Sequence, residues 1–290
     1  LLRPWVAIPR LIHVLWSLAG LVLVLLLRGG SSDPAVQQGL ARRILNTLTG
    51  LGPCFIKLGQ ALSTRPDLVR RDWLEELTRL QDDLPAFPHA TALACIREEL
   101  GAPVEELFEE FPDTPIAAAS LGQVYKARLQ GQHWVAVKVQ RPNLTFILRR
   151  DLVLIRALGV MTAPLLPLNL GFGLGGIIDE FGRSLFEEID YGLEAANAER
   201  FSALFADNDA VYIPKVERML SSTRVLTTTW IDGAKMRDSE ELRSQRLDPT
   251  ALIRTGVICG LQQLMEFGYF HADPHPRTLF ALPGRTGDLG

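Results

Sequence analysis

Residues 117–139 read AAASLGQVYKARLQGQHWVAVKV, and this stretch decides the fold class. Residues 134–139 are rich in valine and contain Val-Ala-Val-Lys, a pattern that is typical of a β-strand. The alanines at the start of the stretch fit a loop that leads into a hairpin, and taken alone they fit an ordinary helix equally well. Because helical patterns lie on both sides of these strand-like residues, the sequence predicts an α+β fold.

The layout of this stretch fits the nucleotide-binding lobe of a protein kinase, in which a glycine-rich loop on a hairpin precedes a strand with Val-Ala-Ile-Lys. Lys138 is then the candidate contact to the α- and β-phosphates of ATP or ADP, and an exposed strand lysine is the alternative. Here the loop has alanines where glycines are expected. Alanine keeps the backbone N–H groups that bind phosphate but adds a Cβ, so a terminal phosphate would sit differently. The candidate nucleotide-binding residues of this loop are Ala117, Ala118, Ala119, Ser120 and Gln123.

An acidic segment over residues 186–201 supplies candidate partners for the lysines. Glu194 shares one helix face with Asn197 and Phe201, so it is the candidate partner of Lys138. Glu188 and Asp190 lie just before that helix. The alternative interpretation is a solvated acidic face, which the neighbouring apolar residues make less favourable.

Residues 50–53, Gly-Leu-Gly-Pro, predict a break followed by a new helix that contains Lys57 and Gln60 on one face. The helix is otherwise apolar almost all round. Its lysine therefore either extends its amine to water or is buried against a carboxylate, because an unpaired buried charge is very costly. Glu188 and Asp190 are the candidates to neutralise Lys57.

The C-terminal part contains two strand-like segments, an apolar helix and a kinase-like motif. Residues 211–216 and 224–230 are strand-like, residues 231–233 are a candidate hinge, and an apolar helix is predicted over 248–268 after an Asp-Pro start. The motif His-Ala-Asp-Pro-His-Pro-Arg-Thr follows at 271–278 and makes Asp273 the candidate catalytic residue. Thr278 stands where kinases have asparagine, and a hydroxyl is the poorer ligand for Mg²⁺. Asp273 and Thr278 are nevertheless the candidate metal ligands. An Asp-Phe-Gly segment is absent, and Asp288 fits a glycine turn better.

An apolar run over residues 11–27 lies near the N-terminus, between Arg10 and Arg28. At about 1.5 Å per residue it is roughly 26 Å long as a helix, which is at the short end for a bilayer span. Trp5 and Trp16 suit a membrane interface. We favour membrane contact over a signal-peptide core or a buried helix, and residues 29–34 fit a linker.

Composition excludes several classes of protein. Hydrophobic residues make up 47% and charged residues 22% of the chain, and the net charge of −3 is typical of a globular protein. Nucleic acid is not an expected partner, because nucleic-acid binders usually carry a basic excess. The three cysteines, Cys54, Cys95 and Cys259, are too far apart for a zinc site or a disulfide framework.

Together these motifs resemble the UbiB (aarF-domain) family of atypical kinase-like proteins. Lys57 to Gln60 is similar to the family's KxGQ signature, residues 117–123 to its alanine-rich loop, and Glu188 to Asp190 to its ExD motif. Lys138 and Glu194 match its ion pair, and residues 271–276 match the first part of its catalytic motif. The resemblance implies Asp273, Lys138 and Glu194 as catalytic residues. It also implies that Lys57 and Gln60 project into the site toward Glu188 and Asp190, so that these four residues are further candidates for cofactor binding.

The same resemblance implies a kinase-like fold with an N-terminal helical extension, use of ATP or ADP with Mg²⁺, and a role in isoprenoid-quinone metabolism at a membrane. Expected partners are a nucleotide, a membrane lipid or prenylated quinone precursor, and quinone-biosynthesis proteins. A cyanobacterial cell membrane or a plastid membrane is the expected setting. The alternative function is a catalytically impaired scaffold or a fragment, because of Thr278 and the missing segment.

The expected domain organisation has four parts. A membrane-associating segment with its linker covers residues 1–33, and the helical KxGQ extension covers 34–110. The kinase-like N-lobe with a helical insert covers 111–233. The start of the C-lobe covers 234–290, and we expect this lobe to be incomplete.

Overall fold

The structure is a computed structural model that describes residues 3–66, 69–78, 80, 85–131, 133–163, 173–236, 239–245, 247–271 and 279–282. These residues form two compact units, and each unit is described by itself. The helical unit comprises the described parts of Leu1–Cys95, Asp113–Tyr125 and Val139–Asp190. The mixed unit comprises those of Ile96–Pro112, Lys126–Lys138 and Tyr191–Gly290.

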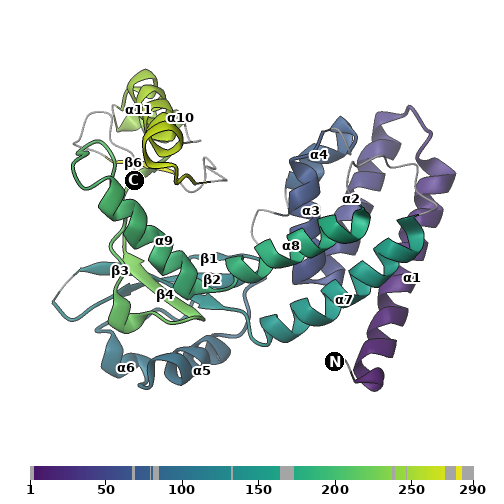
Figure 1. The fold of residues 1–290 in the computed structure, drawn as a ribbon, viewed down its shortest axis with the longest axis horizontal. Coiled ribbons are helices and arrows are strands. Elements are labelled where there is room, and N and C mark those ends of the chain that lie inside the picture. Colours follow the sequence, from purple (N-terminus) through teal and green to yellow (C-terminus); the bar gives the residue numbers. More distant parts are fainter. Residues whose placement is uncertain are drawn as a thin grey trace. The chain divides into compact units, whose positions relative to one another are not determined.

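Six helices make up most of the helical unit (Figure 1). They are α1 (Pro4–Arg28), α2 (Pro34–Leu51), α3 (Pro53–Ser63), α4 (Arg71–Thr78), α7 (Leu144–Thr162) and α8 (Leu174–Glu188). Prolines begin α1, α2 and α3, as expected from a residue whose fixed φ suits the first helical turn. Gly52, with a φ of 94°, separates α2 from α3, so the break predicted at residues 50–53 is confirmed.

One apolar core holds these helices together. Helix α2 packs against α1, α3 and α4, and α7 packs against α3 and α8. Leu51, Cys54 and Leu148, from three different helices, are almost completely buried in this core. The predicted apolar segment over 11–27 is longer than expected, because α1 begins at Pro4 and ends at Arg28.

Residues 117–139 form β-strands joined by turns, and not a helix. Strands β1 (Ala117–Ala118), β2 (Gly122–Arg128), β3 (Trp134–Gln140) and β4 (Val225–Thr229) make one sheet in the order β1-β2-β3-β4. Strand β1 is antiparallel to β2, with Ala117 opposite Val124. The strand predicted over 224–230 is confirmed as β4. The strand predicted over 211–216 is wrong, because Val216 makes an isolated bridge to Thr228 and Pro214 has no N–H for a ladder.

The mixed unit carries the C-terminal helices. Its elements outside the four-stranded sheet are α6 (Val104–Leu107), α9 (Tyr191–Leu204), α10 (Ser239–Ser244), α11 (Pro249–Gln262), β5 (Ala234–Lys235) and β6 (Phe280–Ala281). The residues of α5 (His89–Leu100), β2 and β3 are divided between the two units, and β1 belongs to the helical unit. The apolar helix predicted over 248–268 is α11 followed by a π-helical turn, Gln263–Phe267. The Asp248 carboxylate caps α11 by accepting from the Thr250 amide at 2.9 Å.

Candidate functional site

Strand β3 and helix α9 bring Lys138 and Glu194 together in the mixed unit. The Lys138 ammonium donates to Glu194 Oε2 at 2.7 Å, and the two side chains are 33% and 44% exposed. The same ammonium lies 4.5 Å from the centre of the Tyr191 ring, within the range of a cation–π contact. The predicted partnership of Lys138 with Glu194 is therefore present in the structure. The carboxylate and the aromatic ring hold the amine at one place while a third of the side chain stays open to solvent.

The rest of the α9 face explains how Glu194 is positioned. Tyr191 is fully buried at the start of α9, and its amide donates to the Thr223 carbonyl at 3.1 Å. Further along the same face, Asn197 Oδ1 accepts from the Tyr269 hydroxyl at 2.6 Å, and the Phe201 and Tyr269 rings lie 5.2 Å apart. Helix α9 is thus fixed at both ends of the face that carries Glu194. Sequence reasoning did not identify Tyr191 as a neighbour of Lys138.

A second lysine–glutamate pair lies in the helical unit. The Lys57 ammonium of α3 donates to Glu188 Oε1 at the C-terminal end of α8, and the two side chains are 19% and 45% exposed. Gln60, one turn further along α3, donates its side-chain amide to the Leu80 carbonyl at 2.7 Å. Asp190 follows in the turn between α8 and α9, where its amide donates to the Glu187 carbonyl at 3.2 Å. The structure therefore joins Lys57 to Glu188 and directs the Gln60 amide to a backbone carbonyl.

Gly59 lies between Lys57 and Gln60 and has a packing role that sequence reasoning missed. A Cβ at this position would lie 2.4 Å from Leu80 Cδ1 and 2.7 Å from Leu48 Cδ1. Both leucines are buried in the helical core. Glycine is therefore the residue that lets α3 approach these side chains closely.

The alanine-rich hairpin is closed by its own hydrogen bonds. Ala117 and Ala118 form β1, and the Ala119 amide donates to the Gly122 carbonyl at 2.8 Å across the turn. The Ala119 carbonyl accepts from Arg141 Nε at 3.0 Å, and Ser120 is buried. The N–H of Ala119 thus serves the turn, which differs from the open amides of a glycine-rich phosphate loop.

Gln123 is fully buried and hydrogen-bonded on both sides of its amide. Its Oε1 accepts from the Phe87 amide at 3.1 Å, and its Nε2 donates to the Tyr125 hydroxyl at 2.5 Å. Burial raises the pKa of Tyr125, and the hydrogen bond from Gln123 opposes part of that rise. Both ends of the Gln123 amide are thus engaged within the protein, so it stabilises the approach of residues 85–88 to β2.

The remaining predicted site residues, Asp273 and Thr278, lie outside the described residues. The described part of the motif is His271, whose amide donates to Gln263 Oε1 at 2.8 Å just after the π-helical turn. Asp288, weighed as a mimic of Asp-Phe-Gly, also lies outside them. Within the described ranges, no group of three or more His, Cys, Asp or Glu side chains is placed to hold a metal ion.

Comparison with known proteins shows which family the chain resembles. Residues 79–286 match the ABC1 atypical kinase-like domain. The chain belongs to this family. ABC1 relatives include the Synechocystis protein slr1919, 49% identical over 285 residues that cover 98% of this chain and 50% of that protein. The chloroplastic ACTIVITY OF BC1 COMPLEX KINASE 1 of Arabidopsis thaliana is 45% identical over 86% of this chain and 37% of its own length.

A solved structure supports the ABC1 fold. The complex of Rv3197 with erythromycin from Mycobacterium tuberculosis has a TM-score of 0.58 and 30% sequence identity, over 80% of this chain and 57% of that one. The predicted α+β kinase-like fold is thereby confirmed, as is the resemblance drawn from the motifs. The chain spans half or less of the length of the curated ABC1 relatives named above.

Proposed function

We propose that this chain is the nucleotide-binding part of an atypical kinase-like protein that uses ATP or ADP with Mg²⁺. The observation that carries the proposal is the ion pair between Lys138 and Glu194 at 2.7 Å. A lysine ammonium held in place by a helix carboxylate is how kinases fix the α- and β-phosphates. The Lys138 side chain is 33% exposed, so it is not sealed from a ligand in the solvent.

The residues that we propose to bind Mg²⁺ lie outside the described residues. Asp273 is the proposed catalytic aspartate and, with Thr278, the proposed metal ligand. Bound Mg²⁺ would neutralise phosphate charge during phosphoryl transfer. The contribution of the described residues is to bind and orient: Lys138 contacts the phosphates, and Glu194 and the Tyr191 ring hold the Lys138 amine in place.

Nucleotide binding to Lys138→Ala tests this proposal. We expect the variant to lose at least tenfold in affinity for a fluorescent ATP analogue, because a phosphate contact and its orienting pair are both removed. The matched control is Lys215→Ala, which removes a lysine that is 76% exposed and paired with Glu217. Equal affinity of Lys138→Ala and the unmodified chain, with the circular dichroism spectrum unchanged, would reject the proposal.

A second candidate function is a catalytically impaired scaffold. The observation that favours it is the hairpin turn, in which the Ala119 amide is bound to the Gly122 carbonyl at 2.8 Å. Thr278 also favours a scaffold, because it replaces the kinase asparagine with a poorer ligand for Mg²⁺. The discriminating measurement is ATP turnover by Asp273→Asn. A basal rate that this substitution abolishes removes the scaffold, whereas binding without turnover in the unmodified chain supports it.

We further propose that the protein works at a cyanobacterial or plastid membrane, in isoprenoid-quinone metabolism. Its proposed partners are a membrane lipid or prenylated quinone precursor and quinone-biosynthesis proteins. Cyanobacterial and chloroplastic relatives support the setting. Among the described residues, helix α1 is long enough and apolar enough to cross a membrane. The mean hydropathy of an 18-residue window within it is 2.2. Quinone content in cells that lack the gene, with and without a Lys138→Ala copy, tests the metabolic role.

A further inference from the structure

One face of α1 is fastened to the helical unit. Arg10 makes two hydrogen bonds to the Asp151 carboxylate of α7, one of them at 3.0 Å, and also donates to the Leu51 carbonyl. Asp151 is fully buried and the Arg10 side chain is 12% exposed. Val14 and Leu21 continue the same helical face into the core, and Leu18 packs against it. A buried ion pair and an apolar stripe therefore bind α1 to the protein along its length.

The opposite face of α1 is apolar and exposed. At about 100° per residue its members fall within an arc of about 140°, on the side away from Arg10 and Val14. Trp16 is 82% exposed and Leu26 is 79% exposed. The other exposed members are Trp5, Ile8, Ile12, Leu15, Val22, Leu23 and Leu27. Single exposed apolar residues are ordinary, but a continuous face of this kind marks an interaction surface.

These two faces are incompatible with α1 crossing a bilayer alone. A spanning helix meets lipid on all sides, so Arg10 would have to leave Asp151. The fully buried Asp151 carboxylate would then lose its two hydrogen bonds from Arg10 and keep only the one from its neighbour Arg150 at 2.9 Å. A helix that keeps one face on a folded unit and has an apolar face opposite suits the plane of a membrane interface. Exposed tryptophans at residues 5 and 16 are the side chains that prefer that interface.

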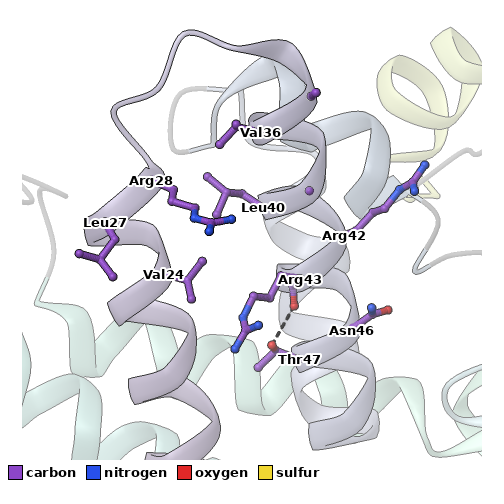
Figure 2. Close-up of a pocket in the computed structure, with 11 residues that line it drawn as sticks. Val24, Leu27, Arg28, Val36, Leu40, Arg42, Arg43, Asn46 and Thr47 are labelled. Carbon is purple, nitrogen blue, oxygen red and sulfur yellow. Dashed lines mark hydrogen bonds between the residues drawn. The ribbon is translucent and has the colours of Figure 1, made fainter.

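A cavity of about 910 Å³ lies between α1 and α2 at the C-terminal end of α1. Figure 2 shows Arg28 of α1 and Arg43 of α2 projecting into this space, while Arg42 points away from it. Arg42 pairs with Glu76 at 3.4 Å. A Cβ on Gly20 would lie 3.9 Å from Arg43 Nη2, so that guanidinium lies against α1 where α1 carries no side chain.

The chemistry of the cavity identifies the class of ligand. Two guanidinium groups come from facing helices, and the apolar wall includes Val24, Leu27 and Leu40. Among the residues that the structure describes, no acid lines the cavity. Guanidinium groups bind phosphate oxygens with two parallel hydrogen bonds, and the apolar wall suits the start of an acyl chain. We propose that α1 lies in the plane of an anionic bilayer, and that Arg28 and Arg43 bind the phosphate of a lipid headgroup in this cavity. This inference rests on the proposed membrane function.

Vesicle flotation tests the headgroup site. The unmodified chain is expected to bind vesicles of phosphatidylcholine with phosphatidylglycerol, and the Arg28→Gln, Arg43→Gln double variant to bind them at least tenfold more weakly. The control, Arg97→Gln with Arg254→Gln, removes the same charge from exposed positions of α5 and α11 and should bind like the unmodified chain. Equal weakening in both double variants would mean that net charge alone acts, and the cavity proposal would fail.

Two further outcomes separate this inference from the proposed function. If the unmodified chain and the Arg28→Gln, Arg43→Gln double variant bind neutral vesicles equally well, membrane association is supported and the headgroup site is rejected. Absence of binding to every vesicle would reject both, without bearing on nucleotide binding. Displacement from anionic vesicles by millimolar glycerol phosphate would instead identify a site for soluble phosphate, and would overturn the choice of a lipid.

Depth measurements test the orientation of α1. Ile8 and Leu26 are about five helical turns apart and lie on the same side of the helix. A depth-sensitive fluorophore is attached at Ile8→Cys or Leu26→Cys, with Cys95 and Cys259 replaced by serine. Quenching by spin-labelled lipids should give the same shallow depth at both positions. A spanning helix would separate the two depths by about 27 Å, which would overturn the proposal.

Discussion

At the scale of single residues, the two lysine–glutamate pairs differ mainly in the exposure of the lysine. The Lys57 side chain is 19% exposed and that of Lys138 is 33% exposed, whereas their partners Glu188 and Glu194 are similarly open, at 45% and 44%. Solvent screens pairs of this kind, so neither is a large source of stability. Their main effect is to fix where each ammonium group lies.

Removing the charge of Glu188 should therefore have a modest effect on stability. We expect Glu188→Gln to lower the free energy of unfolding by about 1 kcal/mol, because Lys57 keeps its charge but loses its partner. A double-mutant cycle with Lys57→Met in urea isolates the pair. If the changes in the free energy of unfolding of the two single variants add up to that of the double variant, the two side chains do not interact in solution.

Glu99 gives a prediction about pH. Burial raises the pKa of Glu99, but hydrogen bonds from Ser222 and Arg224 and the charge of Arg224 outweigh it, so the pKa lies below the ordinary 4.5. A carboxyl with a lower pKa in the folded state stabilises the protein fully above its unfolded pKa, and that stabilisation is lost as the pH falls through the lowered value.

The unmodified chain should therefore have a higher urea midpoint than Glu99→Gln. This difference in midpoint should be constant near neutral pH and become smaller below about pH 4.5. The control is Glu266→Gln, which changes an exposed glutamate of the mixed unit. An advantage that stays constant down to about pH 3 would contradict the lowered pKa.

At the scale of helices and strands, close approach decides the choice of residue at position 59. The Cβ of Gly59→Ala would meet Leu80 and Leu48 methyl groups at 2.4 and 2.7 Å. We expect this variant to be less stable by about 1 kcal/mol, because overpacking outweighs the better helix propensity of alanine. Gly39→Ala in α2 should instead be stabilising, since a Cβ there meets nothing within 4 Å. Urea denaturation of both variants checks the difference in sign.

The hairpin and the helix faces could be predicted because their signals are local. Val-Ala-Val-Lys identified β3, and the spacing of Glu194, Asn197 and Phe201 identified the working face of α9. The acceptor of the Gln60 amide could not be predicted, because it is the backbone carbonyl of Leu80 and every residue offers such a carbonyl. The same applies to Gln123, whose side chain accepts from a backbone amide thirty-six residues away in sequence. The strand predicted over residues 211–216 was wrong because β-propensity takes no account of hydrogen bonding. Pro214 has no backbone N–H to donate to a neighbouring strand.

At the scale of the whole molecule, the chain passes repeatedly between its two units. The passages lie after Cys95, Pro112, Tyr125, Lys138 and Asp190. The two units therefore cannot be separated by cutting the chain at any single point. Each unit has its own buried cluster, with Leu51 in the helical unit and Tyr191 in the mixed unit.

Cys54 reports on the helical unit alone. It is fully buried, and burial, with a smaller contribution from Asp151, raises the pKa of its thiol to about 12 against the opposing charge of Arg10. Maleimide labelling at neutral pH should therefore leave Cys54 unmodified until the helical unit unfolds, because only the thiolate reacts. Mass spectrometry across a urea series measures this. Labelling of Cys54 in native protein as fast as that of the half-buried Cys259 would contradict it.

The contact between Arg10 and Asp151 also sets an order of events during synthesis. The two residues are 141 positions apart, and a ribosome adding roughly 5–20 residues per second needs roughly 7–28 s to cover that distance. For much of that interval α1 lies outside the ribosome while its carboxylate partner has not yet been made. The nascent chain therefore presents an unshielded apolar segment to chaperones and insertion machinery, and translation speed becomes a determinant of whether that segment reaches its place in the folded protein.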